Sequence, residues 1–104
     1  PNIPKVDVIN ALKIEVRPTT KEDIAKRQLP PNISGLIITK IEPDSPINYL
    51  KINDIIVEAG KRRIKSANQL NNLVNTALKS QNKTILIAIF NNQNQKRYIG
   101  VKLD

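Results

Sequence analysis

The chain contains no cysteine, histidine, methionine or tryptophan among its 104 residues. Without cysteine it can form no disulfide. Without either cysteine or histidine it also lacks a thiol nucleophile, an imidazole general base and the usual ligands of zinc. A complete Ser-His-Asp triad is therefore excluded, and we expect this chain to be non-catalytic and to bind no cofactor. Because it begins with Pro1 and contains no methionine, we expect it to be a piece of a longer gene product.

Aromatic residues and long apolar runs are also scarce. Tyr49, Phe90 and Tyr98 are the only aromatic residues of the sequence, too few to stack a series of nucleobases. The longest apolar run, residues 85–90, has the length of a strand and falls far short of the roughly 20 residues that a membrane-spanning helix needs. We therefore expect no membrane insertion.

Acidic residues are outnumbered: 17 Lys and Arg stand against nine Asp and Glu, a net charge of +8. Such a balance makes a nucleic acid or an anionic surface a partner to consider. The basic residues, however, are spread along the whole chain, and the densest cluster, residues 61–65, falls where a turn and a short strand are expected. A solvated basic surface is favoured, and a nucleic-acid-binding domain is the weaker alternative.

The length permits one compact domain with one modest core. Residues 1–10, which include Pro1 and Pro4, predict an irregular N-terminal arm or linker, and residues 11–104 predict the domain. Apolar residues alternate with charged ones over residues 12–16, the pattern of a half-buried strand. Further strands are predicted at residues 36–41, 54–58, 62–64, 83–90 and 96–103.

Helix-capping residues mark the helices between these strands. Thr20 predicts a short helix over residues 21–29, and a one-turn helix is expected from Pro46 to about Leu50. Ser66, with Gln69 three positions later, has the spacing of a capping box and begins a helix over residues 67–78. The pattern predicts an α+β fold: a partly open antiparallel barrel or sandwich with two or three helices.

Three motifs at characteristic separations carry a family resemblance. They are the turn Asp44-Ser45-Pro46, the L-x-x-N-D-x-I stretch of residues 50–56, and the S-x-x-x-L start of the helix at Ser66. Together they resemble a PDZ domain, in the permuted bacterial topology, of the HtrA/Do-type (DegP-like) serine proteases, and the resemblance spans residues 11–103. Where the family has glycine before the aspartate, this chain has Asn53, which tolerates left-handed backbone angles.

The resemblance implies a groove that binds an extended C-terminal peptide by strand addition. Residues 12–16 would be the edge strand, residues 67–78 the facing helix, and the backbone amides of Leu12, Lys13 and Ile14 would hold the terminal carboxylate. The implied peptide-binding residues are Ala11, Leu12, Lys13, Ile14, Val16, Leu70, Asn71, Leu73 and Val74.

Each of these residues also has a simpler interpretation. The apolar ones can be core residues, and the sequence leaves open whether the Asn71 edge or the Leu73 edge of the helix stripe faces the groove. Lys13 stands where the family usually has glycine. If its φ is positive, the side chain costs on the order of 1 kcal/mol, although its ammonium would attract a carboxylate.

The resemblance further implies a non-catalytic module of a trypsin-like periplasmic serine endoprotease that acts in protein quality control. Its partners would be C-terminal or exposed hydrophobic segments of misfolded proteins and the protease domain of the same chain, and it would aid regulation and assembly of the protease. The alternative is a structural or assembly PDZ domain without a working peptide groove.

Overall fold

In the computed structural model, which describes residues 5–103, the chain forms seven strands and two helices. In chain order they are β1 (Asp7–Ile9), β2 (Ile14–Pro18), α1 (Lys21–Arg27), β3 (Leu36–Ile41), β4 (Ile55–Ala59), β5 (Arg62–Arg63), α2 (Ala67–Leu78), β6 (Thr84–Phe90) and β7 (Lys96–Lys102).

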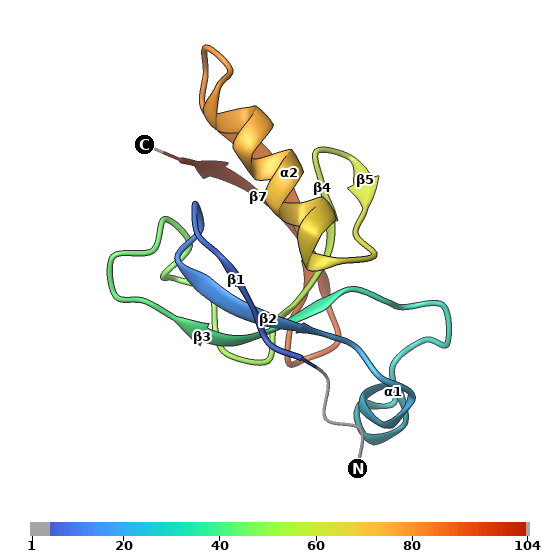
Figure 1. The fold of residues 1–104 in the computed structure, drawn as a ribbon. Helices are drawn as coiled ribbons and strands as arrows, with labels where there is room; N and C mark the ends of the chain where they lie inside the picture. Colours follow the sequence, from blue (N-terminus) through green and yellow to red (C-terminus); the bar gives the residue numbers. More distant parts are fainter. Residues whose placement is uncertain (1–4, 104) are drawn as a thin grey trace.

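All strand pairs are antiparallel, in the order β1-β2-β3-β4-β6-β7, with β5 attached to β4. The sheet is strongly curved but open: α2 lies across the gap between β1 and β6, and α1 lies at the opposite end of the molecule (Figure 1). The predicted α+β class is confirmed: where a partly open barrel or sandwich with two or three helices was predicted, the described residues form an open curved sheet with two helices.

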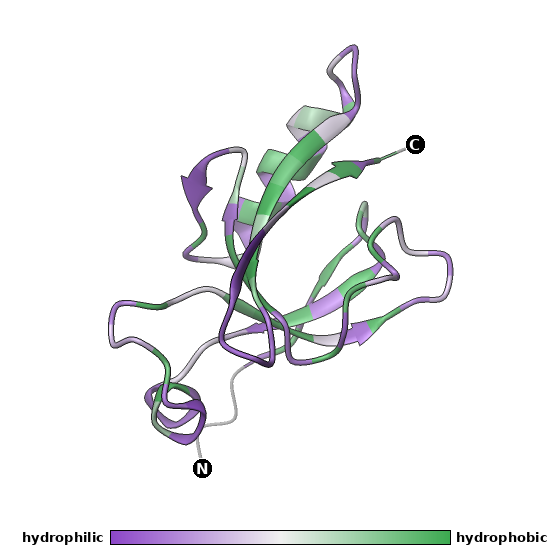
Figure 2. Cartoon of the chain, turned by 180° about the vertical axis from the view of Figure 1, so that it is seen from behind, coloured by the Kyte–Doolittle hydropathy of each residue, from purple (hydrophilic) through white to green (hydrophobic). Residues whose placement is uncertain are grey.

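Strand β6 shows how the sequence divides the core. Its residues alternate, so that Ile85, Ile87 and Ile89 join the larger apolar cluster beneath α2, while Ala88 and Phe90 join a smaller cluster on the other face of the sheet. The hydrophobic colour accordingly follows the strands and the hydrophilic colour marks most loops and exposed turns (Figure 2). The larger cluster contains the strand residues that lie beside the predicted groove.

Both predicted helix caps are present. The Thr20 hydroxyl accepts from the Asp23 amide at 3.2 Å, and the Asp23 carboxylate accepts from the Thr20 amide at 2.8 Å, which completes a capping box. At α2 the Ser66 hydroxyl accepts from the Gln69 amide at 3.1 Å, while the Gln69 side chain accepts from Lys65, one residue before the cap. Helix α2 has the predicted bounds, and α1 is two residues shorter than predicted.

The N-terminal arm differs from the prediction. Residues 7–9 form β1, where an irregular segment was expected, because Ile9 is buried against the main core. Residues 1–4 of the same arm, and residue 104 at the other end, lie outside the described residues.

Two further local predictions need correction. Residues 46–50 form consecutive turns and no helix, because single i to i+3 hydrogen bonds end at Asn48 and at Leu50 without continuing. The strand expected at residues 12–16 begins instead at Ile14 and ends at Pro18.

Candidate functional site

The space between β2 and α2, where the peptide groove was predicted, is occupied by β1 (Figure 1). β1 runs antiparallel to β2, with Asp7 opposite Val16, Val8 opposite Glu15 and Ile9 opposite Ile14. The edge of β2 that faces the helix, expected to be free, is therefore paired with the segment that precedes it in the sequence.

The loop between β1 and β2, residues 10–13, uses its amides within the hairpin. The Leu12 amide donates to the carbonyl of Ile9 at 3.1 Å, and the Lys13 amide donates to the carbonyl of Asn10 at 3.2 Å. Two of the three amides predicted to hold a ligand carboxylate thus point toward the end of β1 and already donate to neutral oxygens there.

The helix side of this site is identified by one hydrogen bond. The Asn71 side-chain amide donates to the carbonyl of Val8 at 3.2 Å, so the Asn71 edge of α2 faces β1. Leu70 and Val74 are fully buried in the main core, and Leu73 packs against that core while partly exposed. Of the two helix edges that the sequence left open, the Asn71 edge is the one that faces β1, and a contact between Asn71 and a peptide stays a prediction.

The predicted contacts on β2 and its loop are mostly core residues. Leu12, Ile14 and Val16 are all buried, and Ala11 is partly buried against the same cluster. Their side chains therefore form the floor beneath β1. A contact between any of them and a peptide remains a prediction.

Lys13 has a left-handed backbone, with φ of 54°. Its ammonium lies 2.6 Å from the carboxylate of Asp44, and this hydrogen bond lowers the pKa of Asp44. The same turn holds the loop backbone, because the Ser45 hydroxyl donates to the Leu12 carbonyl at 2.5 Å and the Glu42 amide donates to the Lys13 carbonyl at 3.0 Å. Sequence reasoning missed this link, since 31 residues separate Lys13 from Asp44.

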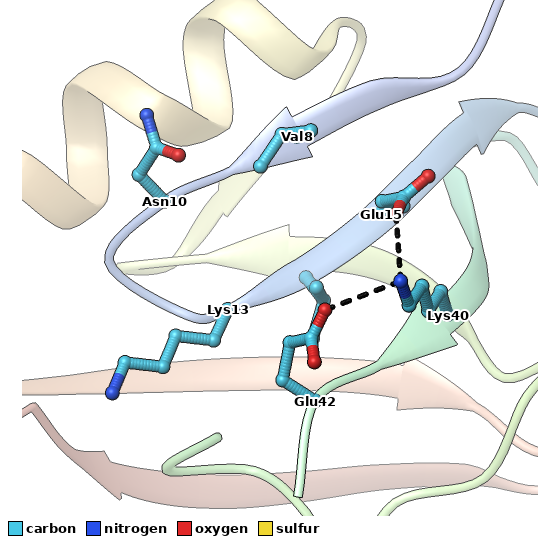
Figure 3. Close-up of a pocket in the computed structure, with 7 residues that line it drawn as sticks. Val8, Asn10, Lys13, Glu15, Lys40 and Glu42 are labelled. Atoms are coloured by element: carbon cyan, nitrogen blue, oxygen red, sulfur yellow. Dashed lines mark ion pairs between the residues drawn. The ribbon is translucent and has the colours of Figure 1, made fainter. Parts of the chain in front are cut away.

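The outer face of the β1–β2 hairpin carries a shallow cavity of about 200 Å³. It is lined by Val8, Asn10, Lys13, Ile14, Glu15, Lys40 and Glu42 (Figure 3). The Lys40 ammonium lies 3.3 Å from Glu42 and 3.7 Å from Glu15, and these carboxylates, Glu42 foremost, raise the pKa of Lys40. Three of the charged residues that line this cavity thus pair with one another, while Lys13 pairs with Asp44 outside it.

A second hollow, of about 340 Å³, lies at the other end of β1. It is bordered by Asp7, Val8 and Pro18 and by the start of α2, from Lys65 to Asn68 and at Asn71. The hollow therefore lies between the first residues of β1 and the first turn of α2.

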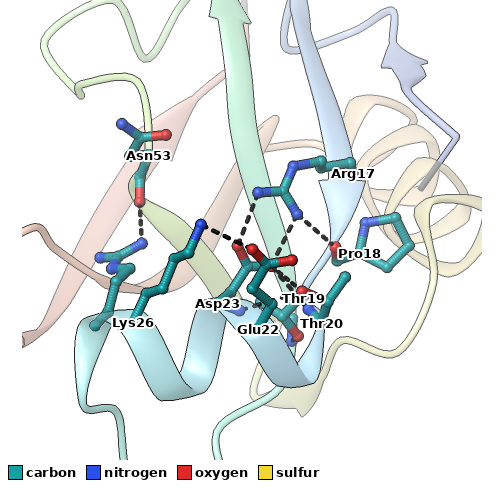
Figure 4. Close-up of polar contacts among 10 residues, drawn as sticks. Arg17, Pro18, Thr19, Thr20, Glu22, Asp23, Lys26 and Asn53 are labelled. Carbon is teal, nitrogen blue, oxygen red and sulfur yellow. Dashed lines mark hydrogen bonds and ion pairs between the residues drawn. The ribbon is translucent and has the colours of Figure 1, made fainter. Parts of the chain in front are cut away.

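At the far end of β2, Arg17 joins the strand to α1 (Figure 4). Its guanidinium donates to both oxygens of Asp23, at 2.8 and 2.9 Å, and Asp23 also accepts from the Thr20 amide and hydroxyl. The Arg17 hydrogen bonds, foremost, hold the pKa of Asp23 far below its usual range. This arrangement fixes α1 against the end of β2.

Within residues 5–103, no three acidic, His or Cys side chains gather closely enough to hold a metal ion. No helix in the same range is both long enough and apolar enough to cross a membrane.

Comparisons with known proteins agree with the motifs. No protein-family model matches the chain. Proteins from Brucella suis biovar 1, Brucella abortus biovar 1 and Brucella melitensis biotype 1, each described as "Probable periplasmic serine endoprotease DegP-like", are 26% identical to it over 72 residues. The match covers 67% of this chain and 14% of each relative, so the chain corresponds to a small part of their length.

A solved structure, "HtrA-type protease AlgW with decapeptide", matches with a TM-score of 0.65 and 20% sequence identity. The match covers 88% of this chain and 27% of that one. The resemblance to HtrA-type, DegP-like proteases predicted from the motifs is confirmed, and the fold is that of a PDZ-like domain of such a protease.

Proposed function

We propose that this chain is a non-catalytic PDZ module that binds peptides by strand addition. The observation that carries the proposal is the position of β1. This extended segment pairs with β2 opposite α2, its last side chain is buried, and its last carbonyl accepts a hydrogen bond from the loop. Ile9 is 0% exposed, and its carbonyl accepts from the Leu12 amide. A peptide ligand bound to a PDZ domain needs these same three features.

The comparisons support this function and extend it. The structural neighbour is described with a decapeptide, and the curated relatives are named as periplasmic serine endoproteases. We therefore infer a parent chain with a trypsin-like protease domain in the periplasm. There the module recognises C-terminal or exposed hydrophobic segments of misfolded proteins and contributes to regulation and assembly of the protease.

Binding in this site uses no covalent chemistry. A ligand strand would form backbone hydrogen bonds with β2. Its terminal carboxylate would accept hydrogen bonds from the amides of Leu12, Lys13 and Ile14. The apolar C-terminal side chain would take the place of Ile9 above the core floor. Of the helix residues, Asn71 would donate to the ligand backbone as it now donates to Val8.

The alternative is a structural or assembly domain without a working groove. The specific observation that favours it is β1 itself, which already fills the site. In that case Asp7–Ile9 is a permanent strand of the fold.

Profiling the chain against a random library of C-terminal peptides separates these two functions. We expect enrichment of peptides with aliphatic C-terminal residues, and we expect their affinity, measured by calorimetry, to fall when the terminal carboxylate is amidated, because the loop amides then lose a charged acceptor. No enrichment, or equal affinity for acid and amide, contradicts peptide capture through this loop and supports the assembly role.

A further inference from the structure

The strand that fills the groove belongs to the chain itself and has the direction that a ligand would have. We propose that β1 is an intramolecular occupant of the peptide groove, which a ligand peptide must displace in order to bind. This inference rests on the peptide-binding function proposed above. It predicts that the closed state, with β1 in place, and the peptide-bound state exclude each other.

β1 is held by few interactions compared with the other strands. It pairs with β2 over three residues, whereas β7 pairs with β6 over seven. Only Ile9 is buried, while Val8 is 52% exposed and Val6 is 43% exposed. Helix α2 supports β1 through the Asn71 hydrogen bond, which goes to a backbone carbonyl that any peptide can offer, and through the apolar cluster that Ile9 shares with Leu70 and Val74.

A ligand can reproduce what β1 contributes and add one interaction. An aliphatic C-terminal residue replaces Ile9, and an exposed residue of any type replaces Val8. The third residue from the end takes the place of Asp7, in the hollow that Lys65 and the first turn of α2 border, where an acidic group is favoured. The added interaction is the free carboxylate: Ile9 offers the loop a neutral carbonyl, and hydrogen bonds to an ionised acceptor are roughly twice as strong.

Tethering gives β1 an advantage that offsets its short length. A segment joined to its site by a four-residue loop, residues 10–13, has an effective concentration of order millimolar or higher. A ligand therefore binds with an apparent affinity reduced by the fraction of molecules in which the groove is free. Weak ligands would be excluded, and peptides with a strongly matching C-terminus would enter.

A reversible disulfide can lock β1 in place. Because the Val8 carbonyl points to α2, Val8 and Glu15 form the pair of the antiparallel ladder that lacks mutual hydrogen bonds, whose Cα atoms lie about 4.5 Å apart. That separation suits a disulfide. The natural sequence has no cysteine, so the double variant Val8→Cys/Glu15→Cys carries one defined pair.

The probe is the acetylated pentapeptide Lys-Val-Asp-Val-Ile with a free carboxylate, which repeats residues 5–9. We expect the reduced double variant to bind it at least about tenfold more tightly than the oxidised form of the same protein. In the wild type, we expect saturating peptide to increase hydrogen exchange at the amides of residues 5–9 and to leave β7 unchanged.

The matched control is a disulfide at the opposite edge of the sheet, in Thr84→Cys/Lys102→Cys. Leu103 donates to Lys83, so the adjacent Thr84–Lys102 pair is also of the type without mutual hydrogen bonds. Its oxidation should leave peptide affinity unchanged. Equal binding by oxidised and reduced Val8→Cys/Glu15→Cys, or unchanged or increased protection of residues 5–9, overturns displacement while peptide binding stands. If neither redox form nor the wild type binds this peptide or any library peptide, the proposed function fails and the inference fails with it.

Discussion

The two ends of β2 are each fixed by a cation paired with an aspartate, but the two pairs differ in kind. At the C-terminal end, Arg17 and Asp23 have side chains only 24% and 16% exposed and share two hydrogen bonds. At the N-terminal end, Lys13 and Asp44 are 47% and 70% exposed and share one. The first pair fixes a helix to the sheet, and the second lies over the loop of the candidate site.

This difference indicates which end of β2 can adapt. A partly buried two-point ion pair with further hydrogen bonds resists separation, whereas an exposed single-point pair contributes little and is screened by salt. The Lys13 side chain can therefore leave Asp44 at little cost. The Leu12 and Lys13 amides can exchange β1 for a ligand while Ser45 and Glu42 hold the loop carbonyls and the Arg17 end keeps the strand in register.

The largest effect is expected from Ile14→Asp, next to the loop. Ile14 is buried in the main core, so an aspartate there places a carboxylate in an apolar environment and should lower the free energy of unfolding by more than about 4 kcal/mol. Urea denaturation followed by circular dichroism measures this, with Ile14→Val as the conservative control, expected to cost about 0.5–1.5 kcal/mol. A stably folded Ile14→Asp protein would mean that this end of β2 is not part of the core, and its peptide affinity would then test the groove.

A moderate effect is expected from Asp23→Asn at the other end. Losing the charged acceptor of Arg17 should lower the free energy of unfolding by about 2 kcal/mol, while the Thr20 cap keeps an acceptor for the helix amide. The control is Glu22→Gln, which removes an exposed ion pair with Lys26 in the same helix and should leave the urea midpoint nearly unchanged. Equal urea midpoints for Asp23→Asn and Glu22→Gln would mean that the Arg17–Asp23 pair stabilises the fold no more than an exposed ion pair does, and the two ends of β2 would then not differ in this respect.

The same aspartate should make stability depend on pH. Its pKa is lowered in the folded protein, so its stabilising contribution is fully present above the unfolded value of about 4 and is lost as pH falls below that value. Urea midpoints at pH 7, 5, 4 and 3 should decrease through the last steps, and less steeply for Asp23→Asn than for the wild type. Parallel curves for the two proteins would assign the acid sensitivity to other carboxylates.

The smallest effect is expected from Lys13→Gly in the loop. Glycine removes the strain of φ 54° but gains freedom in the unfolded chain, and the lost ion pair with Asp44 is exposed, so stability should change by less than about 1 kcal/mol. Peptide affinity should stay within about fivefold of the wild type and depend less on salt, because amides and not the ammonium hold the carboxylate.

Two control variants distinguish the effect of backbone strain at Lys13 from the effect of its positive charge. Lys13→Ala removes the charge and keeps the strained Cβ, and Lys61→Gly relieves a similar strain, at φ 67°, in a turn away from the groove. Lys61→Gly should leave peptide affinity unchanged. A loss of binding well beyond fivefold in both Lys13 variants would show that the ammonium itself contacts the ligand.

Much of the architecture could be predicted from local patterns. The alternation in β6, the caps at Thr20 and Ser66 and the left-handed position of Asn53, with φ of 80°, all follow from rules that act within a few residues. The turns at residues 46–50 could not be separated from a one-turn helix, because a single hydrogen-bonded turn is marginal in either form.

The candidate site shows the limit of such rules. The sequence predicted a loop, a strand and a helix around it and left the sign of φ at Lys13 open, and the structure gives it a φ of 54°. It did not predict β1, because a three-residue strand with one buried side chain has no detectable period. It also could not choose between the Asn71 and Leu73 edges of α2, since both lie beside the same apolar stripe.

The sequence by itself determined the kind of each main element and the family that the chain resembles, since capping, periodicity and motif spacing are properties of short stretches. Only the tertiary structure decided what fills the groove. Ile9 is buried because β1 lies between β2 and α2, and Lys13 contacts Asp44 because the sheet brings together residues that lie 31 positions apart. Such contacts depend on how distant elements pack, and a local sequence pattern does not predict them.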